Sequence, residues 1–211
     1  MTITETQAAE AMLAHHQSLL ENVGVRVEGL SRAVAAGGAY EAAAADLVAY
    51  LADEVLPHAL AEEHTIYPTA GRQDGLAGTV AEMVAEHRTL AAGVEGLAAA
   101  DDGREAATQG EEIGALFAAH VARENDILLP ALLADEGVDL PQVLVQMHRL
   151  TEAAQQTPLV EDAVAPDHEA VMLARFLEAA TDLAHAGHGD RACRLVASVW
   201  ATLRVPRPDL A

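Results

Sequence analysis

Two stretches of the chain, HALAEEHTIYP from His58 and HVARENDILLP from His120, share one pattern. Each begins with His, carries Glu four residues later (Glu62 and Glu124), and ends on Pro after two bulky apolar residues. Residues four apart on an α-helix are rotated by only about 40° and rise about 6 Å, so each His–Glu pair lies on one helix face. The two His–Glu segments therefore predict two long helices that each present an imidazole beside a carboxylate.

Composition and chain breaks favour a helical bundle around these segments. Alanine-rich sequence with only 3% aromatic residues suits close-packed helices better than sheets. Apolar periodicity, interrupted by Gly, Pro and Asp clusters, predicts four long helices over residues 4–36, 40–67, 76–100 and 104–134. Short connections between them predict an all-α, up-down-up-down four-helix bundle.

The chain continues well beyond the fourth predicted helix. We expect the bundle to occupy residues 1–136, a linker with one short helix to occupy 137–165, and an additional C-terminal helical hairpin to occupy 166–211. The hairpin is apolar enough to need a partner surface. That surface is either the bundle or a second copy of the chain in a homodimer.

Charge and cysteine content exclude several classes of function. The net charge of −21, from 33 acidic and 12 basic side chains, repels phosphate backbones and anionic lipid headgroups, so we expect neither nucleic acid nor membrane as a partner. Without a basic signal region or a run of about 18 apolar residues, we expect a cytoplasmic protein. The single Cys193 excludes an internal disulfide and any Cys-based zinc or iron–sulfur site.

The bundle sequence also repeats internally. AHHQSLLENV in the first predicted helix aligns with AEHRTLAAGV in the third, and the alignment matches His16 to His87. Each half of the bundle therefore carries a lone His followed by a His–Glu segment. His15 is the rival of His16, since it points about 100° away on the same helix, and the alignment favours His16.

Four imidazoles and two carboxylates that converge in a bundle core would be costly to bury unpaired. Metal ions remove that cost, because neutral imidazoles ligate through one nitrogen and carboxylates can bridge two cations. Nitrogen and oxygen ligands without thiolates suit iron or manganese in a two-metal site, with zinc as a structural mimic. The ordinary alternative is a surface His–Glu pair. His148 and Glu152 form a third such pair in a polar stretch, which we interpret as background.

Residues 10–135 resemble a hemerythrin-like (HHE cation-binding) domain, whose pattern is His, His-x-x-x-Glu, His, His-x-x-x-Glu on four successive helices. The resemblance implies two non-haem iron ions, bridged by an oxo or hydroxo group and by Glu62 and Glu124. The implied terminal ligands are the four histidines His16, His58, His87 and His120. Ferritin-like di-iron bundles are the competing plan, but they use Glu-x-x-His on two helices, which this chain lacks.

Met83 is the departure from oxygen-carrying members of that family. Those proteins have a further His one turn before the helix-3 histidine, where this chain has Met83. A thioether is a poor iron(III) ligand, so one iron would keep an open position or recruit an oxygen donor such as Tyr50 or Glu63. This argues against reversible oxygen carriage and favours peroxide chemistry, nitric oxide chemistry or sensing.

We therefore expect a non-haem di-iron protein that reacts with or senses dioxygen-derived small molecules. The most concrete reaction is disproportionation of hydrogen peroxide, as in a catalase-like enzyme; a nitric oxide-reactive oxidoreductase is the other enzymatic expectation. The alternatives are a non-enzymatic sensor that binds O2 or NO, and an iron-handling protein. In each case we expect no catalytic residue beyond the metal ligands.

Overall fold

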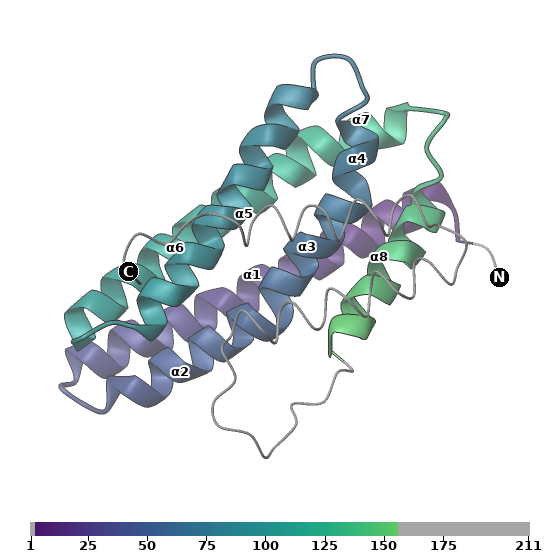
Figure 1. Ribbon diagram of the computed structural model, residues 1–211. Coiled ribbons are helices and arrows are strands. Elements are labelled where there is room, and N and C mark those ends of the chain that lie inside the picture. The colour runs from purple at the N-terminus through teal and green to yellow at the C-terminus, as the bar shows by residue number, and fades with distance from the viewer. Residues whose placement is uncertain (1–2, 156–211) are drawn as a thin grey trace, which may run out of the picture. The chain divides into compact units, whose positions relative to one another are not determined.

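The computed structural model describes residues 3–155, and every regular element in that range is helical. The predicted all-α fold is confirmed for this part of the chain, whereas the predicted hairpin over 166–211 lies outside the described residues. Helix α1 packs against α2 and α6, and α5 packs against α2 and α6, so these helices enclose one interior (Figure 1). The elements are α1 (Glu5–Ala35), α2 (Tyr40–Tyr50), η1 (Leu51–Val55), α3 (Leu56–His64), α4 (Ile66–Ala70), α5 (Ala77–Ala98), α6 (Gly103–Arg123), η2 (Glu124–Leu128), α7 (Leu129–Ala134) and α8 (Leu140–Gln155).

Polar side chains set the start of two long helices. At the start of α1, the Thr4 hydroxyl accepts from the Gln7 backbone N–H at 3.2 Å, and the Gln7 side chain accepts from the Thr4 N–H at 2.9 Å. At the start of α6, the Asp102 carboxylate accepts from the Glu105 N–H at 2.9 Å. These bonds satisfy donors that a helix N-terminus otherwise leaves unpaired. Both helices therefore begin within a residue or so of their predicted starts.

The predicted helix over 40–67 is not continuous, and in this respect the prediction was wrong. Pro57 has no backbone N–H, and the π-helical turn η1 stands directly before it, with the Leu56 N–H donating to the Leu51 carbonyl. Pro57 then occupies the first turn of a fresh helix, α3. A second break falls at Thr65, whose backbone leaves the helical region with φ −122° and ψ −68°.

The predicted fourth helix contains a π-helical turn as well. In η2 the Leu129 N–H donates to the Glu124 carbonyl, five residues back, and Pro130 follows directly. Each π turn thus ends two residues before a proline. The first lies three residues before the predicted ligand His58, and the second begins at the predicted ligand Glu124. Since a π turn adds one residue to a helix turn, each one resets which side chains face the interior.

The interior consists of two apolar clusters with a polar layer between them. On α1, His16 stands between Met12 of one cluster and Leu19 of the other; on α5, His87 stands between Met83 and Leu90. All four of these apolar side chains are at most 4% exposed. Burying them on both sides of the histidines excludes water from the layer, which makes uncompensated polar groups there costly.

Helix α8 is longer than the short helix expected in the linker. It covers 16 residues, and its Leu140 and Met147 are buried in the same apolar cluster as Met12. The Leu140 N–H donates to the Glu5 carboxylate at 3.0 Å. The described residues up to Thr151 form one compact unit. None of the helices in the described range is long and apolar enough to cross a membrane.

Candidate metal centre

The six residues predicted as metal ligands lie together in the polar layer. They come from α1, α3, α5, α6 and the start of η2, and none is more than 5% exposed: His16, His58, Glu62, His87, His120 and Glu124. Their potential ligand atoms gather in two groups, one with His87 and His120 and the other with His16 and His58. We call these groups the His87 half and the His16 half. Glu62 belongs to both.

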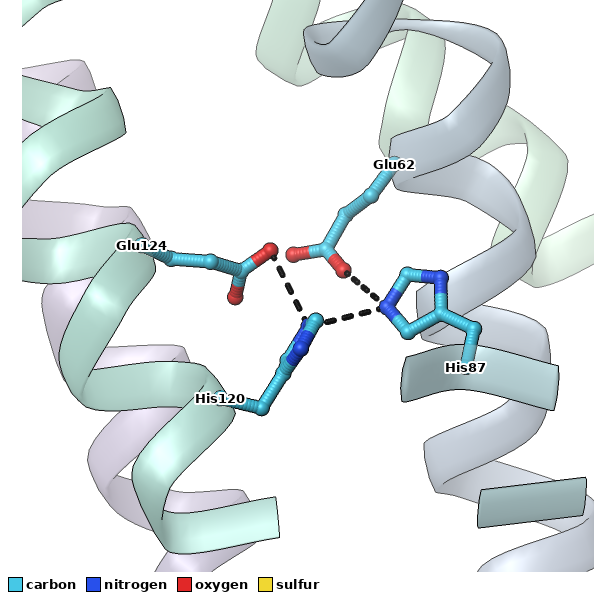
Figure 2. Close-up of side chains that lie close together, drawn as sticks. All are labelled: Glu62, His87, His120 and Glu124. Carbon is cyan, nitrogen blue, oxygen red and sulfur yellow. Dashed lines mark hydrogen bonds and ion pairs between the residues drawn. The ribbon is translucent and has the colours of Figure 1, made fainter. Parts of the chain in front are cut away.

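The His87 half brings the Nε2 atoms of two tilted imidazole rings together. His87 Nε2 and His120 Nε2 are 2.9 Å apart (Figure 2). Glu62 Oε2 lies 3.7 Å from His87 Nε2, and Glu124 Oε1 lies 3.5 Å from His120 Nε2. Four nitrogen and oxygen atoms from three helical segments and η2 therefore surround one small volume.

The His16 half uses the other oxygens of the same carboxylates. Glu62 Oε1 lies 3.0 Å from His58 Nε2 and 3.4 Å from His16 Nε2. Glu124 Oε2 lies 3.7 Å from His16 Nε2. Each carboxylate thus presents one oxygen to each half, which is the arrangement that allows a carboxylate to bridge two cations.

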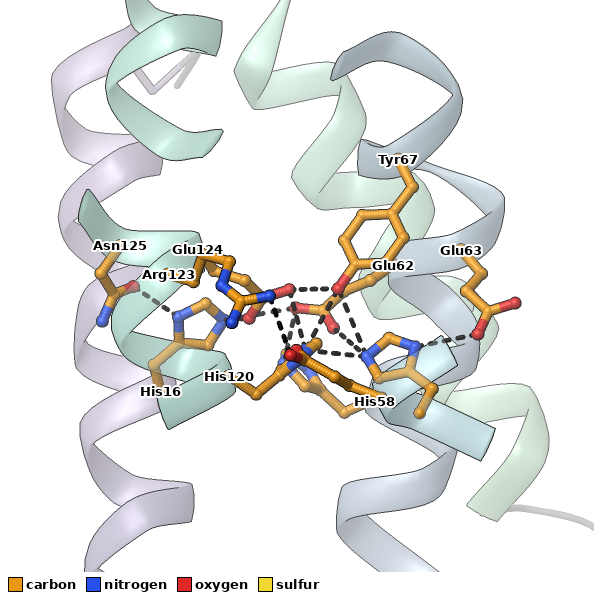
Figure 3. Close-up of polar contacts among 11 residues, drawn as sticks. His16, His58, Glu62, Glu63, Tyr67, His120, Arg123, Glu124 and Asn125 are labelled. Carbon is orange, nitrogen blue, oxygen red and sulfur yellow. Dashed lines mark hydrogen bonds and ion pairs between the residues drawn. The ribbon is translucent and has the colours of Figure 1, made fainter. Parts of the chain in front are cut away.

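The outward-facing nitrogens of three histidines have polar partners (Figure 3). His87 Nδ1 is 2.9 Å from Glu63 Oε1, and His120 Nδ1 is 2.9 Å from Glu86 Oε2. Arg123 in turn reaches the other oxygen of Glu86 at 2.8 Å. Asn125 Oδ1 lies 2.7 Å from His16 Nδ1. His58 Nδ1 has no hydrogen-bond partner among residues 3–155.

These outer contacts show that the donor set suits a cation. A carboxylate only accepts hydrogen bonds, so the proton of His87 and of His120 lies on Nδ1 when the ring is neutral. Both Nε2 atoms then direct lone pairs at each other across 2.9 Å. Glu62 Oε1, Glu124 Oε2 and His16 Nε2 are also buried and, despite their ion-pair distances, lack hydrogen-bond geometry within the described part of the chain. A cation between these atoms would satisfy all of them, and imidazole with carboxylate ligands suits iron.

Protons take the place of a cation in the electrostatics of the metal-free protein. Burial alone would lower the pKa of His16, but its contact with Glu62 and the charges of Glu62 and Glu124 outweigh burial and raise it to about 9. Burial opposes the charged form of His120 in the same way, and the contacts with Glu124 and Glu86 raise its pKa. Burial would raise the pKa of Glu62, yet the neighbouring His58 and His16 hold it well below its usual range. The layer therefore stabilises positive charge at its centre.

Tyr67 is a central residue that the sequence interpretation missed. Its ring is buried among apolar side chains, and its hydroxyl donates to Glu124 Oε1 at 2.7 Å. The Tyr67 hydroxyl oxygen also lies 3.3 Å from His87 Nε2 and 3.2 Å from His120 Nε2 (Figure 3). Burial first, then the charges of Glu62 and Glu124, raise the pKa of this phenol, so it is protonated and donates. Tyr67 adds an oxygen atom to the His87 half.

Tyr50 and Glu63, the oxygen donors expected to complete the site, lie elsewhere. The Tyr50 ring packs under the Arg26 guanidinium, with the carbon of that group 4.2 Å from the ring centre. Glu63 contacts the outward-facing nitrogen of His87, not the cluster centre. The tyrosine oxygen that lies beside His87 and His120 is that of Tyr67.

His15 and His16, left as rivals by helix geometry, have different surroundings. His16 enters the cluster, while His15 packs its ring edge-on against His58, with the ring centres 4.8 Å apart. Burial first, and then the neighbouring His58 and His16, lower the pKa of His15 to about 4. His15 is therefore a neutral neighbour of the cluster. His64, on the same helix as His58, is exposed.

A small cavity adjoins the His16 half. Its volume is about 10 Å³, room for one water-sized molecule, and polar groups line it on one side only. That side consists of His16, Glu62 and Glu124; the rest is apolar, formed by Met12, Ile66, Leu128, Leu129 and Leu132. A small neutral molecule could therefore reach the cluster from this half.

The comparison of the two His–Glu segments could have pointed to Tyr67 and Asn125. Tyr67 stands where the second segment has Leu129, and Asn125 stands where the first has Glu63. A position that changes chemical character between two copies of one segment is a candidate for a distinct role. Glu86, directly before His87, had no such signal, because its contact with His120 depends on how α5 and α6 pack.

A comparison with known families places these features in one of them. The model of the hemerythrin HHE cation-binding domain matches residues 7–132, which include all six clustered residues. Comparison with curated proteins gave no match, and neither did comparison with solved structures. Because the family model covers more than half of the chain and agrees with the polar layer described above, the chain belongs to the hemerythrin HHE cation-binding domain family.

Proposed function

We propose that this protein binds two non-haem iron ions in the polar layer of an up-down-up-down bundle. One iron would be held by His87 and His120, the other by His16 and His58, with Glu62 and Glu124 bridging both. The observation that carries the proposal is the pair of opposed Nε2 atoms, 2.9 Å apart and flanked by two buried carboxylates. When both rings are neutral, protein side chains alone leave that arrangement uncompensated.

The reaction that we propose is the disproportionation of hydrogen peroxide, in which two H2O2 give two H2O and one O2. Two iron ions that each change oxidation state by one electron can exchange the two electrons that this reaction needs. The residues of the chain hold the ions, and the apolar wall of the small cavity restricts access to small neutral molecules. Tyr67, a protonated phenol, would hold Glu124 in place through its hydrogen bond to Oε1.

The metal assignment is tested by iron content. His58→Ala and His120→Ala each remove a ligand, so both variants should lose most of the iron that the unchanged protein retains after expression with added iron and desalting. His64→Ala is the matched control, since it makes the same change on the helix that carries His58, at an exposed residue. Full iron content in His58→Ala or His120→Ala would refute the assignment.

The peroxide assignment needs a separate measurement on protein of known iron content. Oxygen evolution from hydrogen peroxide should follow the iron content across the unchanged protein and its ligand variants. The small cavity equally supports a binder of O2 or NO. Iron-loaded protein that evolves no oxygen, yet changes its visible spectrum reversibly with either gas, would replace the enzymatic proposal with that alternative.

A further inference from the structure

The contacts outside the metal cluster follow the internal repeat of the chain. In both His–Glu segments, the residue after the clustered Glu contacts the lone histidine of the other helical repeat. Glu63 thus contacts His87 Nδ1 at 2.9 Å, and Asn125 contacts His16 Nδ1 at 2.7 Å. The repeat places a carboxylate at one of these matched positions and a neutral amide at the other.

A second pair of matched positions differs in the same direction. The residue before each lone histidine reaches the histidine that opens a His–Glu segment. Glu86, before His87, contacts His120 Nδ1 at 2.9 Å. His15, before His16, packs its ring edge-on against His58 at 4.8 Å between ring centres. Both carboxylates therefore contact histidines of the His87 half, while the His16 half has an amide and an imidazole.

This asymmetry has an electrostatic consequence. A hydrogen bond from Nδ1–H to a carboxylate makes an imidazole a stronger donor to a metal, and more so than a bond to an amide. A nearby negative charge in a buried layer also stabilises the more highly charged ion. Arg123, 2.8 Å from Glu86, offsets part of the Glu86 charge and fixes its orientation. Among residues 3–155, Glu63 forms no ion pair except its contact with His87, so its charge is not offset and carries most of the effect.

We infer that Glu63 and Glu86 set the valence preference of the two metal positions: they make the His87 half the position that favours iron(III), so that the His16 half favours iron(II). The inference rests on the di-iron function proposed above. On treatment of the fully reduced protein with one equivalent of ferricyanide, one electron passes to ferricyanide, giving ferrocyanide and one iron(III) in the His87 half.

Two nearly isosteric substitutions test this inference. Glu63→Gln removes the charge next to His87 and keeps an accepting oxygen, and Asn125→Asp adds a charge next to His16 in the same shape. In a reductive titration we expect two separate one-electron steps for the unchanged protein. Glu63→Gln should raise the lower of the two reduction potentials, which belongs to the His87 half. Asn125→Asp should lower the higher one, which belongs to the His16 half. Each substitution should therefore narrow the separation between the two potentials.

The double variant Glu63→Gln with Asn125→Asp gives the sharpest comparison, because it moves a charge from one half to the other at constant net charge. It should narrow the separation more than either single change, and weaken the mixed-valence signal in electron paramagnetic resonance. Glu95→Gln, an exposed change on the helix that carries His87, is the control for net charge and should leave the separation unchanged. Glu86→Gln replaces Glu63→Gln if the latter does not fold.

Iron content separates failure of this inference from failure of the proposed function. Fewer than two irons in the unchanged protein would overturn the proposed function and the inference with it. Two irons in every variant, with both potentials shifting equally or not at all, would overturn the inference alone. Two irons with opposite shifts in the two single variants would support both.

Discussion

At the residue scale, the Tyr67 hydroxyl lies at the centre of the polar layer. It lies within 3.3 Å of Glu124, His87 and His120, and it comes from a ring that is 2% exposed. The apolar ring contributes to the core while its polar end enters the site. One side chain thus joins the hydrophobic cluster to the proposed metal centre.

Tyr67→Phe should destabilise the metal-free protein by about 1–3 kcal/mol, because it leaves the buried Glu124 oxygen without its donor. Tyr50→Phe is the matched control. The Tyr50 ring is half-buried against Arg26, and its hydroxyl makes no hydrogen bond to residues 3–155. Tyr50→Phe should therefore change the free energy of unfolding much less. Urea unfolding followed by circular dichroism measures both. Equal effects of the two substitutions would contradict the role given to the Tyr67 hydroxyl.

Metal binding to the metal-free protein should release protons. The pKa of His16 is raised from 6.5 to about 9, so this ring is largely protonated at pH 7, and the contacts with Glu124 and Glu86 raise the pKa of His120 as well. A metal requires neutral imidazole, and its apparent affinity should therefore rise as pH increases towards 9. Titration calorimetry with Mn²⁺ in two buffers of different ionisation enthalpy, at pH 7 and 8, counts the protons. A proton count of zero at pH 7 would contradict these pKa directions.

The positions of the clustered side chains could be predicted from the sequence, whereas their outer partners could not. His58 with Glu62, and His120 with Glu124, follow from helix periodicity, which fixes side chains four residues apart on one face. The contacts of Glu86 and Asn125 run between helices, so they depend on how those helices cross. Tyr67 was counted as a bulky apolar residue because the segment ends in such residues in both copies.

At the scale of the helices, glycines permit close approach at some positions and only weaken the helix at others. A methyl group on Gly93 of α5 would lie 2.9 Å from Ile113 Cγ1 of α6, a side chain that is itself buried. A methyl group on Gly24 of α1 would meet nothing within 4 Å. The two positions therefore separate packing from helix propensity.

Gly24→Ala should stabilise the protein by about 0.5–1 kcal/mol through helix propensity alone. Gly93→Ala gains the same propensity but overpacks the contact between α5 and α6, a change that typically costs about 1–3 kcal/mol, so it should destabilise on balance. Thermal unfolding of the two variants gives the comparison. Stabilisation by both would show that Ile113 can move aside at little cost.

Helix ends were predictable where a cap stands in the sequence, and interior irregularities were not. Thr4 and Asp102 are recognisable as capping residues, and α1 and α6 begin directly after them. The π turns before Pro57 and Pro130 have no comparable signature, since a proline can also kink a helix or begin a new one.

At the scale of the whole molecule, α8 is the element that covers one end of the apolar core. Its Leu140 and Met147 are buried with Met12 and Leu132, and residues up to Thr151 belong to the compact unit. A protein of residues 1–155 should therefore fold and retain iron. A shorter protein of residues 1–136 should have a free energy of unfolding lower by several kcal/mol, because it exposes the apolar cluster that α8 covers. Equal melting temperatures of the two would contradict this role of α8.

The central claim is that the polar layer holds two irons, and the most direct test is metal content together with the visible spectrum of protein purified in air. We predict two irons per chain and near-ultraviolet absorption typical of an oxygen-bridged diferric pair, both lost in His58→Ala and His120→Ala and kept in His64→Ala. Zinc in place of iron, or no metal after expression with added iron, would contradict the account and leave the buried histidines a structural role.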